Sequence, residues 1–227
     1  MNFRFWILMA ALLPLLVQTA GGSAMARSVT ASLPPPLPAL FNTDETRVAN
    51  HRPFPKWTGM LERYFEDAGT KPGVCTSRFF NNCHAKRWSD LVDQLKGRDL
   101  TAQLNAVNTF MNQARYTVDS INWGVHDYWA TPGQFLAKFG DCEDYAIAKF
   151  LTLKRLGIDT GKMRIVILQD LNLRIPHAVL AVYTDGGITI LDNQIKRLVQ
   201  AASIHHYHPI FSINEEAWWL HRKKMGR

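Results

Sequence analysis

The chain has 227 residues, of which 47% are hydrophobic, and a formal net charge of +7. This length is enough for one hydrophobic core or two small lobes. The basic residues are spread along the sequence, apart from the dense run HRKKMGR at residues 221–227, and such a distribution is typical of a solvated surface. The sequence contains no nucleic-acid-binding motif, so we do not expect nucleic acid as a partner.

The first 26 residues have the parts of an export signal. Arg4 precedes the apolar run Phe5–Val17, which is too short to span a membrane, and an A-x-A cleavage pattern follows at residues 24–26. We therefore predict a signal peptide at residues 1–26 and export of the rest of the chain. An uncleaved anchor helix is the alternative interpretation.

The exported part is expected to divide into an extended segment and a folded domain. Residues 27–52 include the proline-rich stretch SLPPPLPAL, which is typical of a tether rather than of a core. Residues 53–227 are expected to form the domain.

Helical patterns come first in this domain. The stretch TGMLERYFEDAG at residues 58–69 is a short helix candidate, and Asp99 is placed to cap a helix with apolar residues from 100 to 114. Residues 142–156 predict a further helix, with Gly157 just past its end. Four apolar residues before Gly97 also have helical spacing: Trp88, Leu91, Val92 and Leu95.

Strand-like patterns follow, in MRIVILQ, HAVLAVYT and ITILD, with the turn residues DGG between the last two. Helices followed by an antiparallel sheet indicate an α+β fold.

Three cysteines in an exported chain leave one unpaired. Cys75 and Cys83 lie in a loop-like segment where a disulfide is plausible outside the cytosol, and a zinc site with His84 is the competing interpretation. If the first two pair, Cys142 is the free thiol. Its position at a helix N-terminus favours a reactive thiolate and can hold an oxyanion, so Cys142 is a candidate nucleophile whose own N–H is one candidate oxyanion donor.

His177 and Asp192 are the candidate partners of this thiol. The turn in TDGG predicts a hairpin, and a two-residue loop at Asp185-Gly186 would pair Asp192 with Val179. Because side chains alternate along a strand, His177 and Asp192 then lie on the same face. A three-residue loop without a bulge would place them on opposite faces. The three residues together predict a Cys-His-Asp triad.

Asp141, Glu143 and Asp144 surround Cys142, although negative charge opposes ionisation of a thiol. Two interpretations account for these acids: they cap the helix, or some of them bind a cation. Oxygen ligands in an exported protein favour calcium over zinc, with Asp141 and Glu143 as ligands and Asp127 as a weaker third candidate.

The motifs D-x-W-x-T-P, G-D-C-E-D-Y, P-H-A-V and L-D-N occur in that order between residues 127 and 193. In this the chain resembles the bacterial transglutaminase-like cysteine proteinases, the LapG type of periplasmic protease, roughly from Pro53 to Trp219. The resemblance implies a papain-like/transglutaminase-like fold, with a helical lobe carrying the cysteine and a sheet carrying His and Asp. It implies Cys142, His177 and Asp192 as the catalytic triad, and Asp141 and Glu143 as calcium ligands.

The resemblance also implies a function. Family members cut the N-terminal region of large surface adhesins near a pair of alanines, which releases the adhesin and disperses biofilm. A periplasmic domain of an inner-membrane cyclic-di-GMP receptor sequesters them. Three other functions fit the same residues: an amine-accepting transglutaminase, a peptidoglycan amidase or peptidase, and a non-catalytic binding module.

Overall fold

The computed structural model describes residues 37–67 and 82–224. The predicted signal peptide and Cys75 lie outside the described residues, so the expected cleavage and the expected Cys75–Cys83 disulfide stay predictions. The described residues belong to one compact unit that begins at Leu37. Within them, no helix combines the length and the apolar composition needed to cross a membrane.

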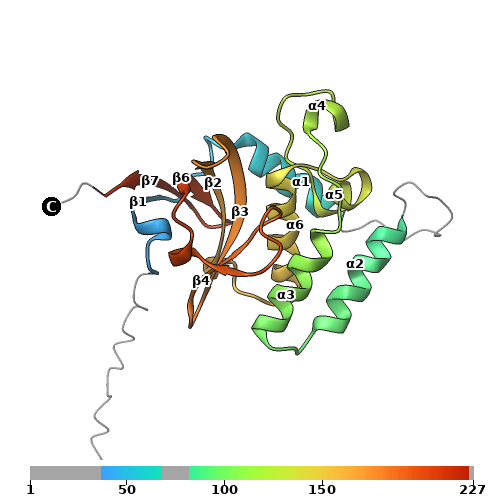
Figure 1. The fold of residues 1–227 in the computed structure, drawn as a ribbon. Helices are drawn as coiled ribbons and strands as arrows, with labels where there is room; N and C mark the ends of the chain where they lie inside the picture. The colour runs from blue at the N-terminus through green and yellow to red at the C-terminus, as the bar shows by residue number, and fades with distance from the viewer. Residues whose placement is uncertain (1–36, 68–81, 225–227) are drawn as a thin grey trace, which may run out of the picture. The chain divides into compact units, whose positions relative to one another are not determined.

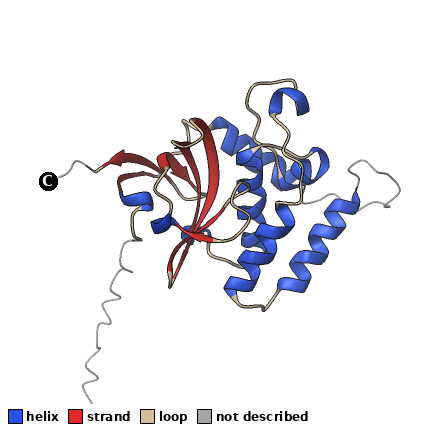
Figure 2. Ribbon diagram, viewed as in Figure 1, coloured by secondary structure: helices blue, strands red, loops and turns tan. Residues whose placement is uncertain are grey.

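The order of elements confirms the predicted α+β class (Figure 2). The helices are α1 (Pro55–Asp67), α2 (Asn82–Leu95), α3 (Leu100–Met111), α4 (Asp119–Asn122), α5 (Pro132–Lys138) and α6 (Cys142–Arg155). The strands are β1 (Thr43–Val48), β2 (Met163–Asp170), β3 (Ile175–Thr184), β4 (Gly187–Leu191), β5 (Val199–Gln200), β6 (Tyr207–Ile213) and β7 (Trp218–Lys223). Three short 3₁₀ helices occupy Leu40–Asn42, Thr160–Lys162 and Ala201–Ser203.

Helix ends follow the predicted capping signals. The Asp99 side chain accepts a hydrogen bond from the N–H of Ala102 and so starts α3. Gly157 follows α6 with a φ of 88°, a left-handed conformation that glycine adopts without steric cost. These local signals set where the two helices begin and end.

All the strands form one antiparallel sheet in the order β1-β7-β6-β2-β3-β4-β5. The β3–β4 hairpin pairs Thr184 with Gly187, so its loop consists of Asp185 and Gly186, the two-residue loop considered above. β3 is longer than β4, whose pairing begins only at Leu180. The N-terminal part of β3, which contains His177, therefore has no β4 partner.

Helix α6 lies between the sheet and the other helices (Figure 1). It packs against β2 and β3 on one side and against α3 and α5 on the other. Every residue from Asp144 to Leu153 is buried. A helix that is buried all round is held by the core on every side, and this fixes the position of its first residue, Cys142.

The N-terminal segment differs from the expected tether. Leu40 is fully buried, and β1 pairs with β7 along its whole length, from Thr43 opposite Lys223 to Val48 opposite Trp218. The domain therefore includes residues from Leu37 onward rather than starting at residue 53. The proline-rich composition up to residue 38 gave no indication of the short strand β1, because its partner β7 lies near the other end of the chain.

A buried ion pair joins β1 to the middle of the sheet. The guanidinium of Arg164 on β2 donates to Glu45 on β1 at 2.7 Å, and it lies 3.6 Å from the centroid of the Trp219 ring. Both charged side chains are nearly buried, at 4% and 12% exposure. Removing one partner of such a pair leaves an uncompensated buried charge.

We expect Arg164→Met to lower the free energy of unfolding by about 3–5 kcal/mol, because the Glu45 carboxylate loses its buried counter-ion. Urea denaturation of both proteins measures this difference. The control is Arg222→Met, an exposed arginine on β7, for which a loss of about 0.5 kcal/mol or less is expected. Equal losses in the two variants would show that the ion pair does not hold β1 to the sheet.

Candidate active site

The loop before α6 holds the first residue of the helix in place. The buried Asp144 carboxylate accepts hydrogen bonds from the N–H of Ala130 at 2.7 Å and from the N–H of Asp141 at 3.3 Å. Gly140 is required here, because a Cβ at this position would overlap the Asp144 carboxylate. Of the three acids around Cys142, Asp141 is the N-cap residue of α6, and Asp144 ties the start of the helix to the preceding loop.

Cys142 is partly buried at the N-terminus of α6, against the unpaired part of β3. The backbone N–H of Ala178, the residue after His177, hydrogen-bonds to the Cys142 sulfur. On its other side the thiol donates to the Glu143 carboxylate at 3.1 Å. Burial, and after it the charges of Glu143 and Asp141, raise the pKa of the Cys142 thiol far above its ordinary value. These acids therefore oppose formation of the thiolate unless their charge is offset.

His177 and Asp192 lie side by side, both almost fully buried. His177 Nε2 is 3.0 Å from Asp192 Oδ1. Burial acts to raise the pKa of Asp192, but hydrogen bonds from His177, Tyr207 and the N–H of Gln194 outweigh it and hold that pKa below its ordinary value. An ionised Asp192 requires a proton on Nε2, which leaves Nδ1 as the nitrogen of His177 that can take a proton.

Two residues that the sequence did not single out complete this arrangement. The Tyr207 hydroxyl donates to Asp192 Oδ2 at 2.6 Å, and the Gln194 side-chain amide lies 3.4 Å from His177 Nδ1. Tyr207 lies in the run HHYH at residues 205–208, which the sequence did not connect with the site. The usable signal was the alternation of strand β6, which buries Tyr207 and Pro209 and exposes His208 and Ile210.

An acidic cluster lies beside the thiol. One carboxylate oxygen each from Asp119, Asp141 and Glu143 lies within 4.8 Å of the others. Asp119 Oδ1 and Asp141 Oδ1 are buried and have no hydrogen-bond partner among the described residues. Burial, followed by the charges of Glu143, Asp144 and Asp119, raises the pKa of Asp141 to about 9. Unpartnered carboxylate oxygens that converge in this way suit a hard cation such as calcium.

The third acid of the cluster is Asp119 and not Asp127, which the sequence suggested as a weaker third candidate ligand. Asp127 is paired with Lys56 and is not part of the cluster. Asp119 is buried at the start of α4, where its Oδ2 accepts the N–H of Tyr128 at 2.5 Å. The segment around Asp119 has no local ligand pattern, because the cluster is assembled from two segments separated by more than 20 residues.

Comparisons with known proteins place this site in a family. Residues 73–224 match the model of the family described as bacterial transglutaminase-like cysteine proteinase. The chain belongs to this family. The protein is therefore a cysteine protease, and the predicted transglutaminase-like fold is confirmed. Among curated proteins, none matches the chain.

Solved structures of LapG from Legionella pneumophila are similar to this protease. One LapG structure is 34% identical, covers 61% of this chain and 78% of the LapG chain, and has a TM-score of 0.56. The calcium-bound form is 32% identical over 70% of this chain and 87% of LapG, with a TM-score of 0.58. An EGTA-treated form is 34% identical over 63% and 78%, with a TM-score of 0.57.

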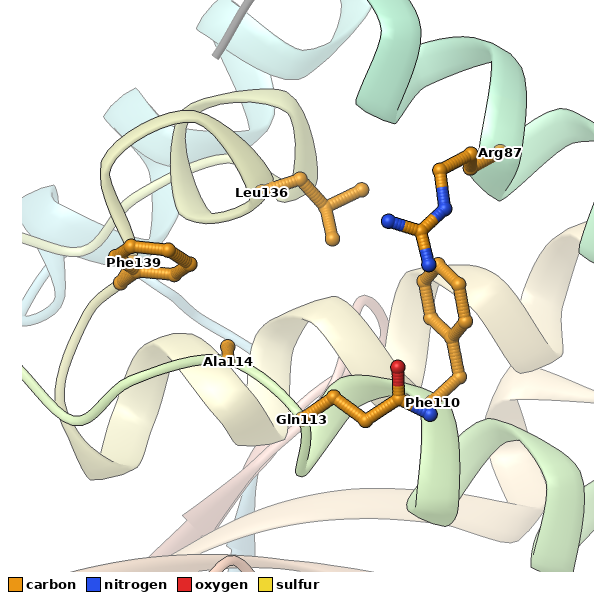
Figure 3. Close-up of a pocket in the computed structure, with 6 residues that line it drawn as sticks. All are labelled: Arg87, Phe110, Gln113, Ala114, Leu136 and Phe139. Carbon is orange, nitrogen blue, oxygen red and sulfur yellow. The ribbon is translucent and has the colours of Figure 1, made fainter. Parts of the chain in front are cut away.

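A pocket of about 180 Å³ lies among the helices of the protease (Figure 3). Arg87 from α2, Phe110 from α3 and Leu136 from α5 point into it, and Phe139 closes it on the side of the Cys142 loop. None of the three predicted triad residues lines this pocket. Cys142 and His177 lie instead where α6 meets β3.

Lys149 is a buried lysine that is influenced by the charge of Asp192. It is fully buried on α6, and its Nζ has no hydrogen-bond partner among the described residues. Burial lowers the pKa of Lys149 to about 7, although the nearby charge of Asp192 acts in the opposite direction. Between pH 7 and the ordinary lysine pKa, the unfolded chain thus binds a proton that the folded protease does not, and stability rises with pH.

We expect Lys149→Met to raise the free energy of unfolding at pH 7 by about 4 kcal/mol, because the substitution removes an uncompensated buried amine. The advantage over the wild type should shrink as pH rises from 7 to 10, since deprotonation removes the same penalty from the wild type. Urea unfolding at several pH values measures this, with the exposed Lys162→Met as the control. A pH-independent difference between Lys149→Met and the wild type would contradict the assignment.

Proposed function

We propose that the protease is a calcium-dependent endopeptidase that uses Cys142, His177 and Asp192 as its catalytic triad. The observation that carries this proposal is the buried His177–Asp192 pair at 3.0 Å, with the Cys142 sulfur held against the backbone N–H of the residue next to His177. A nucleophile, a base and a group that orients the base are the three parts that acyl transfer requires.

The reaction begins with transfer of the thiol proton from Cys142 to Nδ1 of His177. The thiolate attacks the scissile carbonyl carbon, and the carbonyl oxygen takes up the electron pair of the C=O bond. Asp192 holds the imidazole ring and stabilises the imidazolium, and Tyr207 and the Gln194 N–H keep Asp192 ionised and oriented. Collapse expels the amine, which takes the proton from His177, and water then releases the acyl group from Cys142.

Asp119, Asp141 and Glu143 would hold the calcium ion. Their unpartnered buried oxygens fit a hard divalent cation, and a LapG structure of this family is described as calcium-bound. Bound calcium would supply positive charge that offsets these carboxylates. Without the ion, the Glu143 carboxylate accepts a hydrogen bond from the Cys142 thiol. With its charge offset, Glu143 would no longer oppose ionisation of that thiol.

The substrate and partners of this protease are proposed from its family resemblance. We infer that it cuts the N-terminal region of a large surface adhesin near a di-alanine site and so promotes biofilm dispersal. The same resemblance supports a periplasmic location and control by the periplasmic domain of an inner-membrane cyclic-di-GMP receptor. The signal-like sequence of residues 1–26 agrees with that location.

We expect the purified protease to cleave a candidate adhesin N-terminal fragment, and Cys142→Ala to abolish this cleavage. A chelator should suppress cleavage and added calcium should restore it, because the acids beside the thiol need a counter-charge. Gel electrophoresis with mass spectrometry of the fragments measures the result. Cleavage that depends on Cys142 but survives complete chelation would refute the calcium requirement; amine incorporation without cleavage would indicate a transglutaminase.

We expect Asp119→Asn to weaken calcium binding by at least about tenfold, because one anionic oxygen of the cluster becomes an amide. The amide oxygen can still accept the hydrogen bond from Tyr128, so the fold of the loop is retained. Isothermal titration with calcium measures the affinity. The matched control is Asp127→Asn, which lies on the same loop but outside the cluster and should bind calcium as the wild type does. Equal effects of both variants would contradict the assignment of Asp119.

A further inference from the structure

The proposed acyl transfer needs two hydrogen-bond donors for the developing oxyanion. The N–H of Cys142 is one, because the first N–H groups of α6 have no partner within the helix. A single backbone donor is rarely enough, since each oxyanion donor typically contributes about 100-fold or more to the rate. A second donor is expected on the exposed side of the helix N-terminus.

Tyr116 is held at this position by its backbone. It forms a parallel bridge with Gly140, two residues before Cys142, and the N–H of Thr117 donates to the Gly140 carbonyl at 2.9 Å. The segment after α3 is therefore fastened to the loop that leads into α6. This places Tyr116 beside the helix end without any contribution from its own hydroxyl.

The ring of Tyr116 is positioned by a second contact. It stacks on the ring of Tyr145, which follows Cys142 by one turn of α6, with centroids 6.4 Å apart and an interplanar angle of 17°. Tyr145 is itself fixed by a hydrogen bond from its hydroxyl to the Ala114 carbonyl at 2.6 Å. The rigid support of Tyr145 thus holds the Tyr116 ring over the first turn of the helix.

The Tyr116 hydroxyl is near the thiol and open to a substrate. Burial first, and then the charges of Cys142, Asp141 and Glu143, raise the pKa of this hydroxyl above its ordinary value. Tyr116 is nevertheless 51% exposed, and among the described residues no hydrogen bond to its hydroxyl is found. It is a protonated donor that is fixed at the ring and free at the oxygen.

We propose that the Tyr116 hydroxyl and the Cys142 N–H together form the oxyanion hole of the protease. When the Cys142 thiolate attacks the carbonyl carbon, the electron pair of the C=O bond moves to oxygen, and both groups donate hydrogen bonds to that oxyanion. The pair returns when the C=O bond re-forms and the leaving group departs. No proton is transferred from Tyr116 in either step. The inference rests on the proposed nucleophilic role of Cys142.

Gln194 is the competing donor near the thiol. Its side-chain amide lies 3.4 Å from His177 Nδ1, and its backbone N–H is bound to Asp192. These contacts place Gln194 beside the base rather than at the helix N-terminus. Tyr116 is the residue that is tied to the loop and helix carrying the nucleophile.

The experiment compares two reactions of Cys142 in the presence of calcium. Acylation by p-nitrophenyl acetate passes through an oxyanion, whereas alkylation by iodoacetamide displaces iodide and forms none. In Tyr116→Phe, which keeps the stacked ring and loses only the hydroxyl, we expect acylation to fall about 10- to 100-fold, with the alkylation rate unchanged. Tyr64→Phe, on α1, is the matched control and should change neither rate. Unchanged alkylation also shows that the variant has a folded site.

The possible outcomes separate the two claims. If Tyr116→Phe reacts with both reagents as fast as the wild type, the oxyanion role is overturned. An equal fall in both rates would also overturn it, because that result would indicate an effect on the thiolate instead. If acetylation of Cys142 is absent from the wild type, and Cys142→Ala releases p-nitrophenolate equally fast, the nucleophilic role itself fails. A selective fall in acylation supports the proposal.

Discussion

The burial of several carboxyl groups beside one another at the N-terminus of α6 is the constraint on which the rest of the site depends. Asp119, Asp141 and Asp144 all have raised pKa values, and burial is the largest cause in each case. Asp144 is stabilised by two backbone N–H groups, whereas Asp119 and Asp141 each keep an unpartnered oxygen. The positive end of the helix dipole reduces this repulsion by only a fraction of a charge. The pKa of the Cys142 thiol is therefore raised by burial and by the charges of Glu143 and Asp141 in this cluster.

The sheet supplies the other half of the site through the unequal lengths of its strands. Because β4 pairs with β3 only from Leu180 onward, the N-terminal edge of β3 is open to α6, and the Ala178 N–H reaches the Cys142 sulfur there. His177 and Asp192 lie near the ends of these two strands, where the backbone is still held by neighbouring pairs. The β3–β4 hairpin and the buried helix α6 thus meet at one point, and their packing holds the three residues of the proposed triad in place.

The parts of this structure that the sequence predicts are those with local signals. Caps at Asp99 and Gly157, the helical period before Gly97 and the two-residue turn at Asp185-Gly186 all act within a few residues, and the hairpin count put His177 and Asp192 on one face. β1 could not be found in this way, because the residues of its partner strand β7 are 170 to 180 positions away and its burial depends on that partner. Asp119 and Tyr207 were missed for the same reason, since each acquires its role only through contacts made in the folded chain.

Lys149 extends the electrostatic argument along α6. Lys149 lies two turns after Cys142. Burial lowers the pKa of Lys149, and the charge of Asp192 partly opposes this effect. With a pKa of about 7, its charge responds to small changes in the surrounding potential at neutral pH. The helix that begins at Cys142 therefore also carries, inside the core, an amine whose pKa is set by burial and by the charge of Asp192.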